Sequence, residues 1–204
     1  MAVPNERSQH ASAGKTTSWT KASAPEVAGV KITHPERPLY PDINFTKLDL
    51  AHYYDSISDY ILPHLRDRPL TLVRCPEGLS NQSNVNEDNR RNPHSSECFY
   101  MKHSKLWAPP PIRRVRIPEK TKIGDYLVVD SLAALIGLVQ MDVLEIHTWN
   151  STTEHLEQPD RIVFDLDPGP AVQWPQINAA ALLIKSMLAE LGLQVHLCGN
   201  VELE

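Results

Sequence analysis

The run RIVFDLDPGP at residues 161–170 constrains the fold more than any other stretch of the sequence. Its β-branched and aromatic residues are typical of a strand, and Pro168 and Gly169 end it. In a strand, residues i and i+2 face the same side, so Asp165 and Asp167 would point the same way. Two carboxylates this close repel each other unless a cation lies between them or one of them holds a proton. A divalent metal is the cation that we expect there.

Strand-like and helix-like segments are mixed along the rest of the chain. Hydrophobic periodicity and turn residues predict strands at 70–74, 97–103, 126–130, 143–147, 161–167 and from 193. The same signals predict helices at 45–65, 131–141 and 175–191, the last ended by Gly192. Short connections between neighbouring strands favour antiparallel pairing. The expected fold class is therefore α+β, a mixed sheet with flanking helices.

Two helix starts carry capping signals. Thr46 is the expected N-cap of the first helix, with Asp49 in place of the usual Glu of a capping box. Lys47 then lies in the first turn, where a cation is mildly unfavourable to the helix dipole. Such a local conflict is sometimes functional. Asp130 is the expected cap of the second helix.

Length and charge limit the classes of protein that this chain can belong to. The 204 residues, 41% of them hydrophobic, are enough for one core, and the Ala-, Ser- and Thr-rich residues 1–30 have no apolar period. We therefore expect a disordered tail over 1–30 and one domain over 31–204. The net charge of −5 excludes a global basic field, so any contact with nucleic acid must be local.

The cysteines and the apolar runs bear on localisation. The three cysteines are scattered, which argues against a zinc site or a disulfide framework and favours a reducing cytoplasm. No apolar run approaches the ~20 residues of a membrane span, and the N-terminus lacks the apolar core of a signal peptide. The expected location is cytoplasmic.

Taken singly, the candidate site residues are weak signals. An Asp-x-Asp pair is often turn-forming or solvated, and a histidine such as His147 is more often packed or on the surface than a ligand. In combination they are stronger, because the strands expected at 143–147 and 161–167 both present polar groups at their C-terminal ends. Paired carboxylates that hold Mg²⁺ or Mn²⁺ are typical of phosphoryl and nucleotidyl transfer, where a third acid usually completes the site.

Basic residues concentrate between residues 102 and 122. Seven lysines and arginines lie there against the single acid Glu119. In an acidic chain this segment is a candidate contact for a phosphate backbone. The alternative, a solvated basic loop, is equally well supported by the sequence.

Several motifs in a fixed order give the chain a family resemblance. They are THPERPLYPDINFTK, YY, LPHLRDRPLTLVRCPEG, CFYMKH, LEIHTW and DRIVFDLDPGP. In this order, over residues 31 to about 195, the chain resembles the polymerase domain of bacterial DNA ligase D, a primase-polymerase of the archaeo-eukaryotic primase superfamily.

The resemblance implies an activity and the residues that carry it. The activity is metal-dependent addition of nucleotides, preferentially ribonucleotides, from nucleoside triphosphates to broken DNA ends in non-homologous end joining, with Mn²⁺ favoured over Mg²⁺. Asp165 and Asp167 match the family's metal-binding carboxylates. His147 matches a histidine beside the phosphates of the incoming nucleotide.

The resemblance also implies contacts with DNA. Arg37 and Lys47 match a basic pair that reads the 5′-phosphate of the downstream strand, and a guanidinium suits bidentate phosphate binding. Phe99 and Tyr100 match a position where an aromatic ring stacks on a base. We favour Tyr100, because it would share a strand face with Lys102, a further expected DNA contact. Ku-type proteins and ligase or nuclease domains are the implied partners.

The C-terminal end departs from the family pattern. After LGLQVHL, relatives continue with a triphosphate-binding loop and a third metal-binding acid, whereas this sequence reads CGNVELE. We therefore expect a truncated copy whose polymerisation is impaired. The alternative functions are a noncatalytic fragment that binds 5′-phosphorylated DNA ends, and a gene remnant without function.

Overall fold

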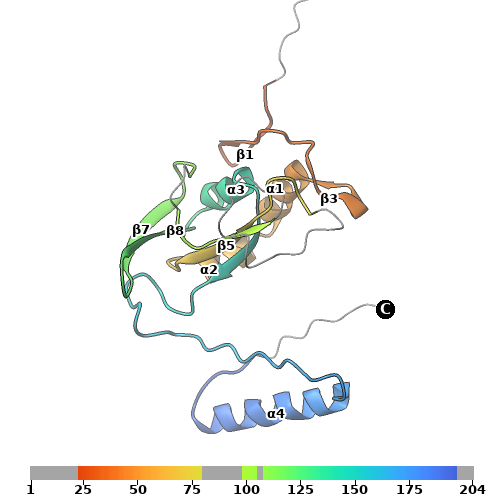
Figure 1. Ribbon diagram of the computed structural model, residues 1–204, viewed down its shortest axis with the longest axis vertical. Helices are drawn as coiled ribbons and strands as arrows, with labels where there is room; N and C mark the ends of the chain where they lie inside the picture. The colour runs from red at the N-terminus through yellow and green to blue at the C-terminus, as the bar shows by residue number, and fades with distance from the viewer. Residues whose placement is uncertain (1–22, 80–97, 105–107, 197–204) are drawn as a thin grey trace, which may run out of the picture. The chain divides into compact units, whose positions relative to one another are not determined.

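Figure 1 shows the computed structural model, which describes residues 23–79, 98–104 and 108–196. The chain divides into two compact units, residues 1–158 and 159–204. Each unit is described by itself. No helix in the described ranges is long and apolar enough to cross a membrane.

The first unit mixes short strands with three α-helices, as the expected α+β class requires. The helices are α1 (Lys47–Ser56), α2 (Ser58–Leu65) and α3 (Leu132–Gln140), and a 3-10 turn covers Pro41–Ile43. The strands of the main sheet are β5 (Leu70–Arg74), β6 (Phe99–Met101), β7 (Arg113–Pro118), β8 (Ile123–Val128) and β9 (Val143–Thr148). Two small hairpins precede them, β1 (Glu26–Val27) with β2 (Val30–Lys31) and β3 (Pro38–Tyr40) with β4 (Phe45–Thr46).

Strand β5 is the centre of the main sheet, in which every pairing is antiparallel. β9 pairs along all of β5, from Leu70 to Arg74. β6 lies opposite Leu72–Arg74 and β8 opposite Leu70, so these two strands share the other edge of β5. β7 continues the sheet beyond β8. In this order, β6 and β9 lie on opposite sides of β5.

The core lies between the sheet and helices α1 and α3. Helix α3 is buried from Ala134 to Val139, and Leu70 and Leu72 of the sheet belong to the same apolar cluster. Gly137 is needed inside this helix because a Cβ there would lie 3.1 Å from the Ile112 side chain. The packing holds the C-terminal end of α3 against the rest of the unit.

The capping predictions are confirmed at Thr46 and wrong at Asp130. The Thr46 hydroxyl accepts the Asp49 N–H at 3.2 Å, and the Asp49 carboxylate accepts the Thr46 N–H at 2.8 Å. Helix α3 is capped instead by the Ser131 hydroxyl, which accepts the Ala134 N–H. Asp130 accepts hydrogen bonds from the Asp67 N–H and the Arg113 Nε, which occupy its carboxylate.

Several predicted boundaries are corrected. The first helix is interrupted at Ile57, the strand expected at 97–103 covers only Phe99–Met101, and β7 was not predicted. The strands expected at 161–167 and from 193 do not form over residues 161–167 and 193–196, because no described strand pairs with either segment. Order begins before residue 31, since β1 and β2 lie within the expected tail; residues 1–22 are outside the described part.

The second unit contains helix α4 (Trp174–Glu190). It begins with a capping box between Gln173 and Gln176 and ends, as predicted, just before Gly192, which has a φ of 76°. The apolar period predicts one face at Ile177, Ala181, Ile184, Leu188 and Leu191, and the first four of these are the helix residues that are partly covered, whereas Leu191 is exposed. The helical period of the sequence is therefore confirmed.

The prediction that the chain has no disulfide is wrong. Cys75 and Cys98 are joined by a disulfide, and both are buried beside Val73. The pairing follows from the register of the sheet, because Arg74 of β5 lies opposite Phe99 of β6 and the cysteines are the next residues along. The sequence alone did not indicate this pair, because Cys75 and Cys98 are 23 residues apart.

Reduction of this disulfide is expected to lower the free energy of unfolding by about 3 kcal/mol, because the bond closes a loop with a sequence separation of 23. Chemical denaturation with and without dithiothreitol measures the difference. The Cys75→Ser/Cys98→Ser variant is the control, in which the reductant should change nothing. Equal stability of the reduced and oxidised wild type would contradict the prediction.

Candidate functional site

Three basic side chains converge on the turn between α3 and β9. Lys47 Nζ lies 2.7 Å from Asp142 Oδ1 and donates to the Gln140 carbonyl at 3.1 Å. Arg37 Nη1 lies 3.1 Å from the same carboxylate oxygen. Arg74 Nε donates to the Met141 carbonyl at 2.6 Å. We call Arg37, Lys47, Arg74 and Asp142 the basic cluster; Arg37 and Lys47 contact the Asp142 carboxylate, and Arg74 binds the adjoining Met141 carbonyl.

The buried position of Lys47 explains its unfavourable place in the first turn of α1. The residue is 1% exposed, and its ammonium reaches the carbonyls at the C-terminal end of α3, where the helix dipole is negative. Burial lowers the pKa of Lys47, while the hydrogen bond to Asp142 opposes that shift. Lys47 therefore supports the cluster from inside and presents no ammonium at the surface.

Arg37 is the more accessible member of the expected phosphate-reading pair. Its side chain is 26% exposed, and Nη1 also donates to the Pro76 carbonyl at 2.5 Å. The Lys47 N–H donates to the Arg37 carbonyl, which ties the two backbones together. Among the described residues, Nε and Nη2 of Arg37 have no partner, so they are available to an anion.

A second group of expected site residues lies on the exposed face of the main sheet. His147 Nε2 lies 2.9 Å from Glu145 Oε2, and both side chains are about half exposed. Tyr100 and Glu145 flank Val73 on its two sides in the register of the sheet. The rings of Tyr100 and His147 are 6.1 Å apart. The sheet thus brings together residues from β6 and β9 that the sequence places far apart.

The two aromatic candidates are separated by the alternation of β6. Tyr100 is 38% exposed, whereas Phe99 packs against the core and has the Arg74 guanidinium 5.6 Å from its ring centroid. Of the two rings, only that of Tyr100 is open to a base. Tyr100 and Lys102 are both exposed, with the buried Met101 between them, although β6 itself ends at Met101.

Asp165 and Asp167 lie in the second unit, in an irregular and exposed segment. His147, in contrast, belongs to the first unit. Two exposed carboxylates offer the hard oxygen donors that Mg²⁺ and Mn²⁺ prefer, so the donor chemistry fits such an ion. Within the described ranges, no group of three or more His, Cys, Asp and Glu side chains is placed to hold a metal.

Three basic residues of the segment at 102–122, Lys102, Arg113 and Lys122, form ion pairs with acids, and residues 113–118 form β7. Lys102, His103 and Lys122 gather around Glu119, with Lys102 Nζ 3.2 Å from its carboxylate. Arg113 binds both Asp67 and Asp130 at 2.7 Å. These internal partners support the interpretation of a solvated structural segment, and Lys102 as a DNA contact stays a prediction.

Hydrogen bonds from the Tyr126 hydroxyl and the His103 ring lower the pKa of Glu119 to about 2. Because this value lies below the ordinary ~4.3 of an unfolded glutamate, Glu119 stabilises the fold above pH ~4.3, and that contribution is lost as the pH falls toward 2. Glu119→Gln should therefore flatten the dependence of thermal stability on pH between about 4.5 and 2. Exposed Glu157→Gln is the control. If the thermal stability of Glu119→Gln changed with pH as steeply as that of the wild type, the lowered pKa of Glu119 would be contradicted.

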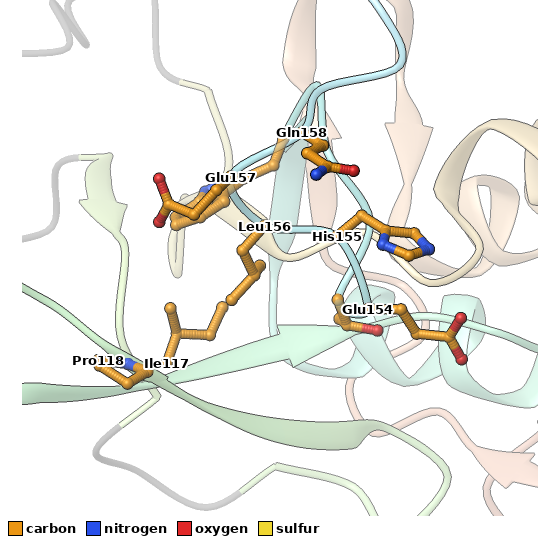
Figure 2. A pocket seen from close by; sticks show the side chains of 9 residues that line it. Ile117, Pro118, Glu154, His155, Leu156, Glu157 and Gln158 are labelled. Atoms are coloured by element: carbon orange, nitrogen blue, oxygen red, sulfur yellow. The ribbon is translucent and has the colours of Figure 1, made fainter.

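A pocket lies beside β7, away from the residues expected from the sequence. It is lined by Ile117, Pro118, Trp149 and residues 153–158. Figure 2 shows Leu156 facing Ile117, with Glu154 and Glu157 directed to opposite sides. The described residues that line the pocket include no lysine or arginine. The pocket therefore lacks the positive charge that would bind an anionic substrate.

A family model for the LigD primase-polymerase domain matches residues 46–198. The chain belongs to this family. The chain is 38% identical over 176 residues to the multifunctional non-homologous end joining protein LigD of Pseudomonas aeruginosa. The match covers 86% of this chain and 19% of that protein. The bifunctional non-homologous end joining protein LigD of Bacillus subtilis is 26% identical over 197 residues, or 89% of this chain and 28% of the relative.

A solved LigD structure agrees with the fold. The polymerase domain of Mycobacterium tuberculosis ligase D, in complex with DNA, matches with a TM-score of 0.60 and 26% identity, covering 80% of this chain and 55% of that chain. The family and the α+β fold expected from the sequence are thereby confirmed. This LigD primase-polymerase chain spans about a fifth of the length of the Pseudomonas relative.

Sequence reasoning missed two members of the basic cluster, Arg74 and Asp142. Arg74 was predicted to be the last residue of a strand. Asp142 was only a residue of the turn between a predicted helix and a predicted strand. Arg74 lies within the motif LPHLRDRPLTLVRCPEG but had no feature that marked it as a site residue, and Asp142 lies outside the quoted motifs. Only the packing of α3 against α1 and β5 brings them to Arg37 and Lys47.

Proposed function

We propose that this chain performs metal-dependent nucleotidyl transfer at DNA ends in non-homologous end joining. Membership of the LigD primase-polymerase family supports the proposal, as do relatives named for that pathway and a solved relative in complex with DNA. The observation that carries it is the basic cluster. A terminal phosphate is a compact anion, and Arg37 offers it a partly exposed guanidinium, of which Nε and Nη2 have no partner among the described residues.

The roles in the transfer step follow the expected site residues. Asp165 and Asp167 would hold Mn²⁺ or Mg²⁺, which would activate the attacking 3′-oxygen and neutralise charge on the triphosphate. His147, whose ring is oriented by Glu145, would lie beside the phosphates of the incoming nucleotide. Tyr100 would stack on a base, which its exposure allows.

A second candidate function is binding of 5′-phosphorylated DNA ends without catalysis. It is favoured by the location of the basic cluster, whose four members, Arg37, Lys47, Arg74 and Asp142, all belong to the 1–158 unit. End binding could therefore operate independently of metal binding. Ku-type proteins and ligase or nuclease domains are proposed partners for either function, in the cytoplasm near the nucleoid.

One pair of assays separates the two functions. Binding of the full chain to a gapped DNA duplex with a downstream 5′-phosphate is measured by fluorescence anisotropy, and extension of the same duplex with labelled ribonucleotides is measured in Mn²⁺. Binding with extension supports nucleotidyl transfer. Binding without extension supports the end-binding function, and the absence of both contradicts the two proposals together.

A further inference from the structure

Asp142 has a backbone conformation that is unusual for a residue with a side chain. Its φ is 60°, in the left-handed region that glycine adopts without cost. Asp and Asn tolerate this region better than other residues, and such conformations occur often at functional sites. The side chain here is the only carboxylate of the basic cluster.

The Asp142 carboxylate links a buried cation to an accessible one. Its Oδ1 lies 2.7 Å from Lys47 Nζ and 3.1 Å from Arg37 Nη1. The Lys47 side chain is 2% exposed, that of Asp142 14% and that of Arg37 26%. The three groups therefore form a path from the interior toward the surface, with Asp142 in the middle.

The backbone around Asp142 is held on both sides. The Asp142 N–H donates to the Val139 carbonyl at 2.9 Å, and its carbonyl accepts the Cys75 N–H at 2.8 Å. The next residue after Cys75 is Pro76, whose carbonyl accepts the same Arg37 Nη1. One nitrogen of the guanidinium is thus fixed by two acceptors from different elements.

We propose that Asp142 is a positioning residue that orients the Arg37 guanidinium for the 5′-phosphate of a DNA end. The proposal rests on the proposed binding of DNA ends. With Nη1 fixed, Nε and Nη2 keep the fork geometry that a phosphate accepts in a bidentate manner. Lys47 holds the carboxylate in place from the buried side.

A carboxylate next to an anion site could instead weaken binding by repulsion. The Lys47 ammonium at 2.7 Å compensates the charge of Asp142 from the buried side, so the two form a nearly neutral pair toward the phosphate. Loss of orientation therefore outweighs loss of repulsion when the carboxylate is removed. Removal of the Asp142 carboxylate is therefore expected to weaken the preference for a 5′-phosphate over a 5′-hydroxyl.

The test compares affinities for gapped duplexes with a downstream 5′-phosphate or 5′-hydroxyl. Asp142→Asn keeps a residue that suits the left-handed region, and Asp142→Gly removes the side chain and the strain together. Both should reduce the phosphate preference at least fivefold, with affinity for the 5′-hydroxyl duplex changed less than twofold. In an Arg37→Ala background, Asp142→Asn should have no further effect on that preference.

Circular dichroism and thermal melts check that each variant is folded; if Asp142→Asn does not fold, Asp142→Gly carries the comparison. An unchanged or increased preference in a folded Asp142 variant overturns the proposal, as does an additive effect in the Arg37→Ala background. If the wild type shows no phosphate preference, the proposed end binding fails, and this inference falls with it. A wild-type preference that survives Arg37→Ala overturns the positioning role alone.

Discussion

Replacement of Lys47 by methionine is expected to lower the free energy of unfolding by about 3–4 kcal/mol, although the two side chains have similar volumes. Methionine fills the space but removes the donor to Gln140 and the buried one of the two cations beside Asp142, whose side chain is only 14% exposed. The Asp142 carboxylate then keeps only the partly exposed Arg37 as a counter-ion, and breaking a buried ion pair by removing one partner costs more than the pair contributes. Urea denaturation of the full chain measures the change.

The matched control for this variant is Lys31→Met. Lys31 is an exposed lysine in β2, so its replacement should change stability by less than about 0.5 kcal/mol. A further variant, Lys47→Met/Asp142→Asn, should recover part of the loss, because it also removes the carboxylate charge that has lost its buried partner. Equal effects of Lys47→Met and Lys31→Met would show that the buried pair does not stabilise the fold as the structure indicates.

Replacement of Asp165 and Asp167 by asparagine is expected to reduce ribonucleotide incorporation about a hundredfold or more, which corresponds to about 2.7 kcal/mol of lost transition-state stabilisation. Asparagine keeps the shape of each side chain but removes the charge that a divalent cation requires. Affinity for the 5′-phosphorylated duplex should be unchanged, because the basic cluster lies in the other unit. Single-turnover extension and anisotropy measure the two quantities.

Glu190→Gln is the control for the carboxylate variant. Glu190 is an exposed acid in the last turn of α4, in the same unit, and its replacement should leave incorporation within twofold. Incorporation that survives in the Asp165→Asn/Asp167→Asn variant would show that other residues bind the metal. A parallel loss of DNA affinity would show that the carboxylates support the fold or the DNA contact instead.

The helical parts of the fold were predictable because their signals are local. The capping box at Thr46, the apolar period of α4 and the stop at Gly192 all depend on residues within one or two turns. Strands were less predictable, since a strand forms only where another supplies hydrogen bonds. The run at 161–167 has strand composition but no described partner, whereas β7, rich in arginine, forms because β8 pairs with its whole length.

The candidate site was predictable where a motif carried it. Arg37, Lys47, Tyr100 and His147 were singled out from the sequence, and the structure groups them in two pairs, Arg37 with Lys47 and Tyr100 with His147. The burial of Lys47 and the role of Asp142 depend on how α3 packs against α1, which no local pattern specifies. The Cys75–Cys98 disulfide depends in the same way on the register of β5 and β6.

The most direct test of the account is extension of a gapped DNA duplex by the wild-type chain, with labelled ribonucleotides and Mn²⁺, on two substrates that differ only in the downstream 5′ group. The account predicts faster incorporation on the 5′-phosphate than on the 5′-hydroxyl duplex, and none when the metal is chelated. Equal rates on the two substrates, or incorporation that persists without the metal, would contradict it.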